Sequence, residues 1–214
     1  MKRIGITSVL LLSVATLAAC STNSAPVPAS SSATSPNSST ASASAADQVD
    51  PTPSASPAAF LQTNCAAPQY NQKLDAAPTD SVELNGVYEK TDPQGVPVVT
   101  IGEGLPPATD LATLDLTEGT GKTVKAGDTI TFDYCGIGQT TRGMFDSSWS
   151  RGKPLSYPLD QLIPGWQEGI PGMKEGGSRL LIIPGALAYG ENPPAGIMPN
   201  ETLVFVVSVK SIDK

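Results

Sequence analysis

One acidic side chain stands out as a candidate for chemistry, because it falls among aromatic residues in the second half of the chain. Asp146 directly follows Phe145. The other members of this aromatic series are Tyr134, Trp166, Tyr189 and Phe205. A carboxylate in such surroundings suits acid–base or electrostatic work on a bound molecule. Capping of a turn is the competing interpretation of Asp146.

The residue types that are missing narrow the chemistry further. The 214 residues include no histidine, no cysteine pair at metal-ligand spacing, no glycine-rich loop of the phosphate-binding kind and no serine with a plausible base partner. We interpret Ser147 and Ser148 as turn residues and not as nucleophiles. Hydrolase, metalloenzyme and nucleotide-binding functions therefore lose support, and we expect neither a metal nor a cofactor.

The elements that position these residues are predicted to be strands around one short helix. After a Pro-Gly corner, Trp166 and Ile170 lie four residues apart, which places both on one face of a helix. In the segment 129–135, hydrophobic and polar residues alternate as in a half-buried strand, with Tyr134 facing inward. Further strands are expected at 111–118, 179–183 and 202–212. These patterns predict that the second half of the chain is an α+β domain, in which one helix packs across an antiparallel sheet.

The N-terminus has the features of a lipoprotein signal peptide. A positively charged start precedes an apolar stretch at 4–17, which is too short for an ordinary transmembrane helix. The sequence Leu17-Ala18-Ala19-Cys20 resembles the lipobox of bacterial lipoproteins, in which the cysteine is lipidated and becomes the first mature residue. Two acyl chains hold a protein on a membrane where one binds only reversibly. Residues 1–19 are therefore predicted to be removed, leaving Cys20 anchored at the extracytoplasmic face of the cell membrane; a simple secreted protein with an incidental cysteine is the alternative.

Between this anchor and the domain, two segments differ in composition. Residues 20–59 consist almost entirely of Ser, Ala, Pro and Thr, which predicts a disordered tether. Residues 60–110 contain some apolar residues and a plausible strand at 98–101, and we interpret them as an extension packed on the domain at 111–214. Loss of the signal peptide leaves 11 basic and 20 acidic residues, so the net charge changes from −7 to −9. This acidity argues against nucleic acid as a partner.

Five motifs resemble, in order and spacing, the FKBP-type peptidyl-prolyl cis-trans isomerases, the family of macrolide-binding immunophilins. The motifs are Tyr134, Phe145-Asp146-Ser147-Ser148, Leu162-Ile163-Pro164-Gly165-Trp166, Ala188-Tyr189-Gly190 and Leu203-Val204-Phe205. The resemblance covers about residues 111–214. It implies the family's fold, a half-barrel in which an antiparallel sheet wraps around one short helix.

The resemblance also implies a binding site for a proline ring. Asp146 and Tyr189 are expected to be its catalytic polar groups, with Arg151 as the basic partner of Asp146. The base, walls and rim of the site are assigned to Tyr134, Phe145, Leu155, Tyr157, Leu162, Ile163, Trp166, Ile197 and Phe205. Two of these positions depart from the family's pattern: Leu155 stands where an aromatic residue is common, and Tyr157 replaces a frequent phenylalanine.

The implied reaction is rotation about the bond that precedes proline, which a chain without histidine is able to catalyse. The resonance of the amide raises a barrier of about 18–20 kcal/mol, and no covalent bond breaks. A dry aromatic pocket favours the twisted amide, and the Tyr189 hydroxyl is the candidate donor to its carbonyl oxygen. We therefore expect a monomeric peptidyl-prolyl isomerase that acts on proline-containing segments of exported proteins, with macrolides as further ligands. Two alternatives remain, a chaperone module of the same fold without useful turnover and a structural envelope lipoprotein.

Cys65 and Cys135 are predicted to form a disulfide. With Cys20 lipidated, these two cysteines remain in a compartment that permits oxidation. Because Tyr134 must face the pocket, alternation turns Cys135 to the outer face of the sheet, where the extension could dock. The bond would pin residues 60–110 to the domain. Two buried free thiols are the alternative.

Overall fold

The computed structural model describes residues 59–67, 69 and 71–213 of the chain. The predicted signal peptide, the predicted lipidation site Cys20 and all but the last residue of the predicted tether lie outside the described residues. Within the described part of the chain, no helix is long and apolar enough to cross a membrane.

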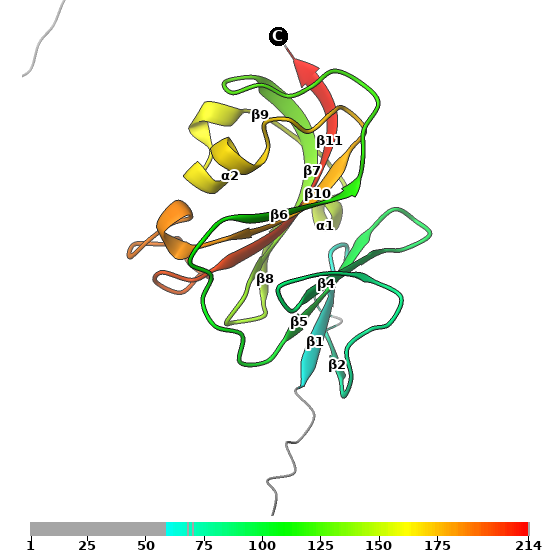
Figure 1. The fold of residues 1–214 in the computed structure, drawn as a ribbon, viewed down its shortest axis with the longest axis vertical. Helices are drawn as coiled ribbons and strands as arrows, with labels where there is room; N and C mark the ends of the chain where they lie inside the picture. Colours follow the sequence, from blue (N-terminus) through cyan, green and yellow to red (C-terminus); the bar gives the residue numbers. More distant parts are fainter. Residues whose placement is uncertain (1–58, 68, 70, 214) are drawn as a thin grey trace, which may run out of the picture. The chain divides into compact units, whose positions relative to one another are not determined.

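The larger of two sheets is antiparallel and has six strands, five of them in the order β6-β10-β11-β7-β8 (Figure 1). The sixth strand, β9, pairs with the first half of β7, while β8 pairs with the second half. The strands are β6 (Ala112–Thr117), β7 (Thr129–Gly138), β8 (Met144–Ser147), β9 (Leu155–Pro158), β10 (Ser178–Ile183) and β11 (Leu203–Asp213). All the strands predicted from 111 onward are present, and β7 and β11 are the longest.

Strand β7 has the alternation that the sequence predicts, and both of its faces are buried in its second half. Ile130, Phe132 and Tyr134 belong to one hydrophobic core, which also contains Trp166. Cys135 belongs to a second core on the opposite face. The sheet is therefore covered on both sides, which explains why β10 and β11 read as nearly continuous apolar runs.

The helix across the first face is α2 (Pro164–Gly169). Pro164 stands at its first turn, where a proline costs no hydrogen bond and its fixed backbone angle suits a helix. Trp166 and Ile170 are 3% and 0% exposed and pack against the sheet, as their spacing predicts. The remaining helices are the short α1 (Ser148–Arg151), η1 (Leu159–Gln161) and η2 (Gly185–Leu187). The predicted α+β fold, an antiparallel sheet around one short helix, is confirmed.

Residues 60–102 form a second, smaller sheet, for which the sequence predicted a single strand at 98–101. It is antiparallel and five-stranded, in the order β2-β1-β5-β4-β3. Its strands are β1 (Phe60–Asn64), β2 (Gln72–Leu74), β3 (Val82–Leu84), β4 (Val87–Thr91) and β5 (Pro97–Gly102). Two of them have three residues each, which is too short for alternation to reveal. Pairing with the longer β1 and β4 is what makes them strands.

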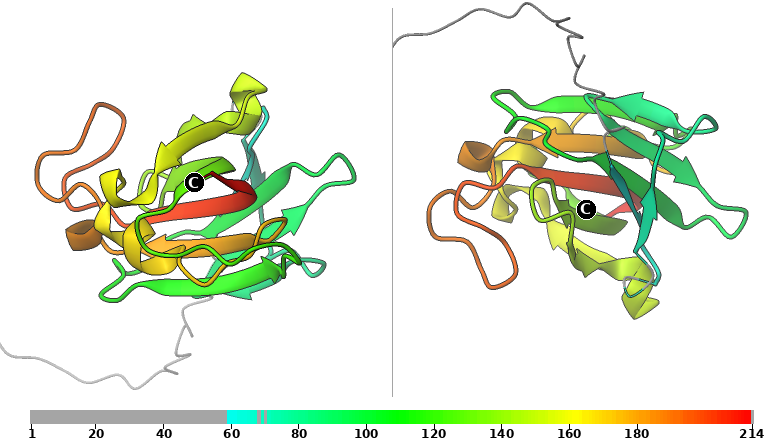
Figure 2. Two further views of the ribbon diagram at one scale, coloured as in Figure 1. Left: turned by 90° about the horizontal axis from the view of Figure 1, so that it is seen from above. Right: turned by 90° about the horizontal axis from the view of Figure 1, so that it is seen from below.

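The smaller sheet packs on the face of the larger sheet that is turned away from α2. Val87, Val99 and Ile101 are buried in the second core together with residues of β7, β10 and β11. Both views of Figure 2 show this arrangement, with α2 in yellow and the smaller sheet in cyan to green on the other side. Residues 60–110 are therefore an extension that shares a core with the domain.

A disulfide joins the two sheets. Cys65, directly after β1, is bonded to Cys135 of β7, and their Cα atoms are 5.8 Å apart. Both residues are buried, at 0% and 1% exposure. The predicted pair is thus bonded in the structure, on the face of β7 that alternation assigned to Cys135, and the alternative of two free thiols does not apply to it.

Candidate functional site

A cavity of about 300 Å³ opens between the larger sheet, α2 and the loop that joins β10 to β11. This volume is at the small end of the range for ligand pockets. The cavity is lined by Phe132, Tyr134, Phe145, Asp146, Leu155, Leu162, Ile163, Trp166, Tyr189, Pro194, Ala195, Ile197 and Phe205. Most of these side chains are apolar or aromatic, so the cavity suits a compact apolar group with few polar contacts.

The Trp166 indole lies at the centre of an aromatic cluster at this cavity. Its ring centroid is 5.0 Å from that of Phe132, 5.3 Å from that of Phe205 and 6.0 Å from that of Tyr134. Tilted and edge-to-face pairs of this kind contribute about 0.5–1.5 kcal/mol each beyond their burial. Because the three partners come from β7 and β11, the cluster fixes α2 on the sheet and gives the cavity a rigid aromatic surface.

A second aromatic pair forms part of the wall. The rings of Phe145 and Phe205 meet edge to face with centroids 5.6 Å apart. They pack over Gly136, where a Cβ atom would lie 2.5 Å from Cζ of Phe145 and 2.7 Å from Cε1 of Phe205. The absence of a side chain at residue 136 therefore allows both rings to lie against the sheet.

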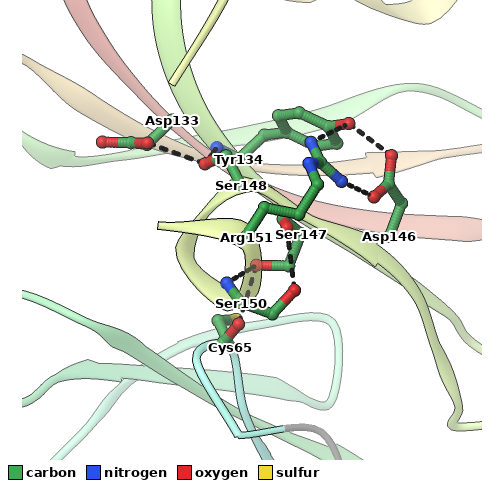
Figure 3. Close-up of polar contacts among 8 residues, drawn as sticks. All are labelled: Cys65, Asp133, Tyr134, Asp146, Ser147, Ser148, Ser150 and Arg151. Atoms are coloured by element: carbon green, nitrogen blue, oxygen red, sulfur yellow. Dashed lines mark hydrogen bonds and ion pairs between the residues drawn. The ribbon is translucent and has the colours of Figure 1, made fainter. Parts of the chain in front are cut away.

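Three side chains form what we call the polar network: Tyr134, Asp146 and Arg151. The Tyr134 hydroxyl donates to Oδ2 of Asp146, and Arg151 pairs with Oδ1 of the same carboxylate (Figure 3). Nη2 of Arg151 also donates to the Tyr134 hydroxyl at 2.9 Å, and its guanidinium carbon lies 5.3 Å from the centroid of the Tyr134 ring. Both oxygens of Asp146 are thus engaged, as the predicted pairing with Arg151 requires. The competing interpretation of Asp146 as a turn cap does not describe these contacts.

Local structure explains how residues 146 and 151 come together. Asp146 is in β8, and Arg151 ends α1, which begins two residues later. The Ser147 hydroxyl accepts a hydrogen bond from the main-chain N–H of Ser150 at 3.4 Å and so caps α1. Gly152 ends the helix in the left-handed conformation, with φ of 65°, which suits a glycine. One turn of helix therefore returns the chain to Asp146.

Tyr189 is the second phenol of the cavity and differs from Tyr134 in its contacts. It follows η2 and is 39% exposed. In the part of the chain that the structure describes, no group forms a hydrogen bond with its hydroxyl. Burial, followed by the negative charge of Asp146, raises its pKa above the ordinary tyrosine value. The hydroxyl is therefore protonated at neutral pH and available as a donor to a bound molecule.

Burial also raises the pKa of Tyr134, and its hydrogen bond to Asp146 acts in the same direction. Arg151 opposes this change by stabilising the phenolate. Because the net shift is upward, Tyr134 keeps its proton at neutral pH and the donation to Asp146 is maintained.

The loop between β10 and β11 supplies the cavity residues Pro194, Ala195 and Ile197, and a buried acid holds it in place. Glu201 is 5% exposed and accepts from the main-chain N–H of Met198 and from that of Thr141, both at 2.8 Å. One carboxylate thus joins this loop to the turn that leads into β8. Sequence reasoning missed Glu201, because its neighbours gave no periodic signal.

Most of the predicted binding residues meet at the cavity, and one does not. Tyr157 is absent from its lining and is 38% exposed. It pairs with Ile130 in the ladder, whereas Leu155, which does line the cavity, pairs with Phe132. Tyr157 lies two residues further along β9, outside the cavity lining, and its part in substrate binding stays a prediction. Conversely, Phe132, which is not among the predicted binding residues, also lines the cavity.

Among the described residues, no group of three or more His, Cys, Asp or Glu side chains is placed to hold an ion. The polar network instead pairs its carboxylate with an arginine and a phenol.

Comparison with known proteins gives a consistent set of relatives. Residues 120–210 match the family model described as FKBP-type peptidyl-prolyl cis-trans isomerase. An FK506-binding protein of Streptomyces anulatus is 46% identical over 120 residues, which cover 54% of this chain and 96% of that protein. A probable FK506-binding protein of Corynebacterium glutamicum is 42% identical over 106 residues, covering 50% and 90%. The FKBP-type peptidyl-prolyl cis-trans isomerase FkpA of Escherichia coli is 45% identical over 94 residues, covering 44% of this chain and 34% of FkpA.

Proposed function

The chain belongs to the FKBP-type peptidyl-prolyl cis-trans isomerase family, and from that premise we propose that its aromatic cavity is where the bond preceding proline is rotated. The family resemblance of the five motifs is confirmed, and the chain is a peptidyl-prolyl isomerase. The observation that carries the proposal for the site is the cavity around Trp166, which combines aromatic walls with a single uncommitted phenol at residue 189.

Binding of the prolyl ring in this cavity removes water from the amide. The planar amide is the more dipolar form and loses more when water is removed, so the twisted form is favoured in relative terms. Tyr189 donates to the carbonyl oxygen of the residue before proline and holds the twisted geometry. No proton needs to leave the substrate, and no covalent bond breaks.

Asp146 has a different part in this proposal. Its two oxygens are already engaged by Tyr134 and Arg151, so it is poorly placed to accept a proton from a substrate. It instead places a fixed negative charge at the wall of the cavity and orients the Tyr134 ring, which also lines it. Charge and ring are thus in position before the substrate binds.

The test is an exchange measurement on a short X-Pro peptide with the purified domain, residues 59–214. We expect NMR exchange spectroscopy to show faster cis-trans interconversion in proportion to enzyme concentration. Peptide binding without faster exchange would favour the alternative of a non-catalytic chaperone module. Absence of both would contradict the proposed site, and competition by a macrolide would show that the two ligands share the cavity.

We further propose that the protein acts outside the cytoplasm as a lipid-anchored monomer, with proline-containing segments of exported proteins as its clients. The lipobox-like Leu17-Ala18-Ala19-Cys20 supports this location. A buried disulfide is also typical of an oxidising compartment. Cys20→Ser should release the protein from membranes and abolish labelling by radioactive palmitate, and continued membrane association of that variant would refute the anchor. Light scattering on the released form tests the monomer.

A further inference from the structure

Cys65 of the extension contacts both strands that carry the polar network. Its sulfur is bonded to Cys135 of β7. Its carbonyl oxygen accepts a hydrogen bond from the Ser147 hydroxyl, at the end of β8, at 2.7 Å. Cys135 and Ser147 lie directly opposite each other in the ladder, and all three residues are at most 1% exposed. One residue next to the smaller sheet thus holds two adjacent strands of the larger sheet.

The two contact points are next to the polar network in sequence. Tyr134 immediately precedes Cys135, and Asp146 immediately precedes Ser147. The Ser147 hydroxyl also caps α1, the helix that carries Arg151 (Figure 3). A shift of β8 against β7 would therefore move the donor and the acceptor of the Tyr134–Asp146 bond relative to each other.

Cys65 is itself firmly placed in the smaller sheet. Its main-chain N–H donates to the carbonyl oxygen of Pro97, at the start of β5, at 3.0 Å. Trp149 of α1 packs against the core that contains Cys65 and Val99. The extension thus contacts β7 and β8 directly, on the face of the sheet opposite to the cavity, and shares with α1 the core against which Trp149 packs.

We propose that Cys65 is a positioning residue of the isomerase site, a clamp that holds β7, β8 and α1 in the arrangement that the polar network requires. The inference rests on the proposed function, because it assigns a role to the extension in that same site. It gives Cys65 an indirect part in the reaction, although no residue of the extension lines the cavity.

The domain has a further set of contacts of its own, which limits the size of the effect. The Ser148 hydroxyl accepts from the main-chain N–H of Tyr134 at 2.9 Å and donates to Asp133 at 2.7 Å. These bonds hold the start of α1 to β7 without the extension. We therefore expect loss of the clamp to lower kcat/KM by about twofold to thirtyfold, the range over which residues remote from a ligand modulate a coupled site.

Two variants remove the clamp in different ways. The double variant Cys65→Ala, Cys135→Ala removes the covalent bond but keeps the carbonyl of residue 65. Ser147→Ala keeps the disulfide and removes the hydrogen bond to Cys65, together with the side-chain cap of α1. Val99→Ala is the matched control, since it opens a small cavity in the same buried core and leaves Cys65, Cys135 and Ser147 unchanged. All are assayed on the full chain, far below the thermal midpoint of each variant.

A structural role alone would lower the thermal midpoint of all three variants and leave kcat/KM unchanged. The clamp predicts lower kcat/KM for the double variant and for Ser147→Ala, with Val99→Ala at the wild-type value. It also predicts that the Cζ resonance of Tyr134, observed with ¹³C-labelled tyrosine, shifts in the first two only. If the double variant does not fold, Ser147→Ala decides. Wild-type kcat/KM and an unshifted resonance in the folded clamp variants would overturn the inference, whereas an inactive wild-type protein would overturn the proposed function.

Discussion

The side chains of Tyr134 in β7 and Asp146 in β8 are hydrogen-bonded to each other. The Tyr134 hydroxyl donates to the Asp146 carboxylate and accepts from Arg151 at 2.9 Å. The phenol of Tyr134 therefore has both its donor and an acceptor position occupied by protein. A substrate meets a charge and a ring that are already fixed, so little reorganisation accompanies the reaction. The Tyr189 hydroxyl, which also lies at the cavity, is the one available to donate to a substrate.

Tyr189→Phe is expected to lower kcat by about twofold to tenfold, which corresponds to one hydrogen bond of about 0.5–1.5 kcal/mol made in the twisted state. The thermal midpoint should stay near the wild-type value, because the hydroxyl has no partner in the described part of the chain. Exchange rates on an X-Pro peptide and a melting curve measure the two quantities. An unchanged kcat would show that the donor to the carbonyl lies elsewhere.

Asp146→Asn should reduce kcat/KM and also lower the thermal midpoint, in contrast to the change at residue 189. An asparagine retains one acceptor oxygen, but its amide group presents donors to Arg151 and removes the charge that the arginine pairs with. The ¹³C resonance of Tyr134 should shift in this variant. Wild-type activity together with a shifted resonance would mean that the polar network is structural only.

Sequence patterns predicted the parts of the site that lie on long, regular elements. Apolar and polar residues alternate in the first half of β7, which predicted that Tyr134 faces inward. Trp166 and Ile170 lie one helical turn apart, which predicted that both are buried on one face of the helix. Register along a strand is not visible in such a pattern. Tyr157 lies on the same face of β9 as Leu155 but outside the cavity lining, because it pairs with Ile130 and not with the cavity residue Phe132.

The smaller sheet and its contacts were beyond the reach of sequence patterns for a different reason. Strands of three residues, such as Val82–Leu84, are stabilised by neighbouring strands and carry no period of their own. The Cys65–Cys135 pairing followed from counting cysteines and from alternation. The hydrogen bond from Ser147 to Cys65 depends on the approach of two sheets, which only the folded chain reveals.

Gly136→Ala should destabilise the domain by about 1–3 kcal/mol, the usual cost of overpacking, and distort the cavity wall. The new methyl group would overlap the rings of Phe145 and Phe205, which have no free space to move away from the sheet without entering the cavity. Chemical denaturation gives the free energy of unfolding, and peptide titration gives the affinity. Gly143→Ala in the same hairpin is the control, since its Cβ would meet nothing nearer than 3.9 Å. Equal behaviour of the two variants would contradict the packing argument.

Glu201→Gln should raise KM more than it lowers kcat, because it loosens the loop that carries Ile197 without touching the polar network. A glutamine has one acceptor oxygen, so one of the two main-chain N–H groups that Glu201 now accepts from loses its partner, at a cost of about 1–3 kcal/mol when buried. Amide hydrogen exchange at Met198 and Thr141 locates the loss directly. Protected amides at both residues would show that the loop is held by other contacts.

Glu89 makes the stability of the folded protein depend on pH, and the sign of this dependence can be predicted. It is 4% exposed in β4, on the face that carries the buried Val87, and its carboxylate accepts from the Thr91 hydroxyl at 2.8 Å. Burial raises its pKa in the folded protein above the ordinary glutamate value, and the Thr91 hydrogen bond only partly opposes this. In the unfolded chain Glu89 therefore ionises first as the pH rises, so the stability contributed by Glu89 is complete at acid pH and is lost on passing the folded pKa.

Glu89→Gln keeps an acceptor for Thr91 and cannot ionise, so its stability relative to wild type should increase from pH 4 to pH 7. Denaturation at several pH values measures this difference, with the exposed Glu168→Gln as a control that should follow wild type. A constant difference between Glu89→Gln and wild type across this range would show that the buried carboxylate does not lose stability on ionising.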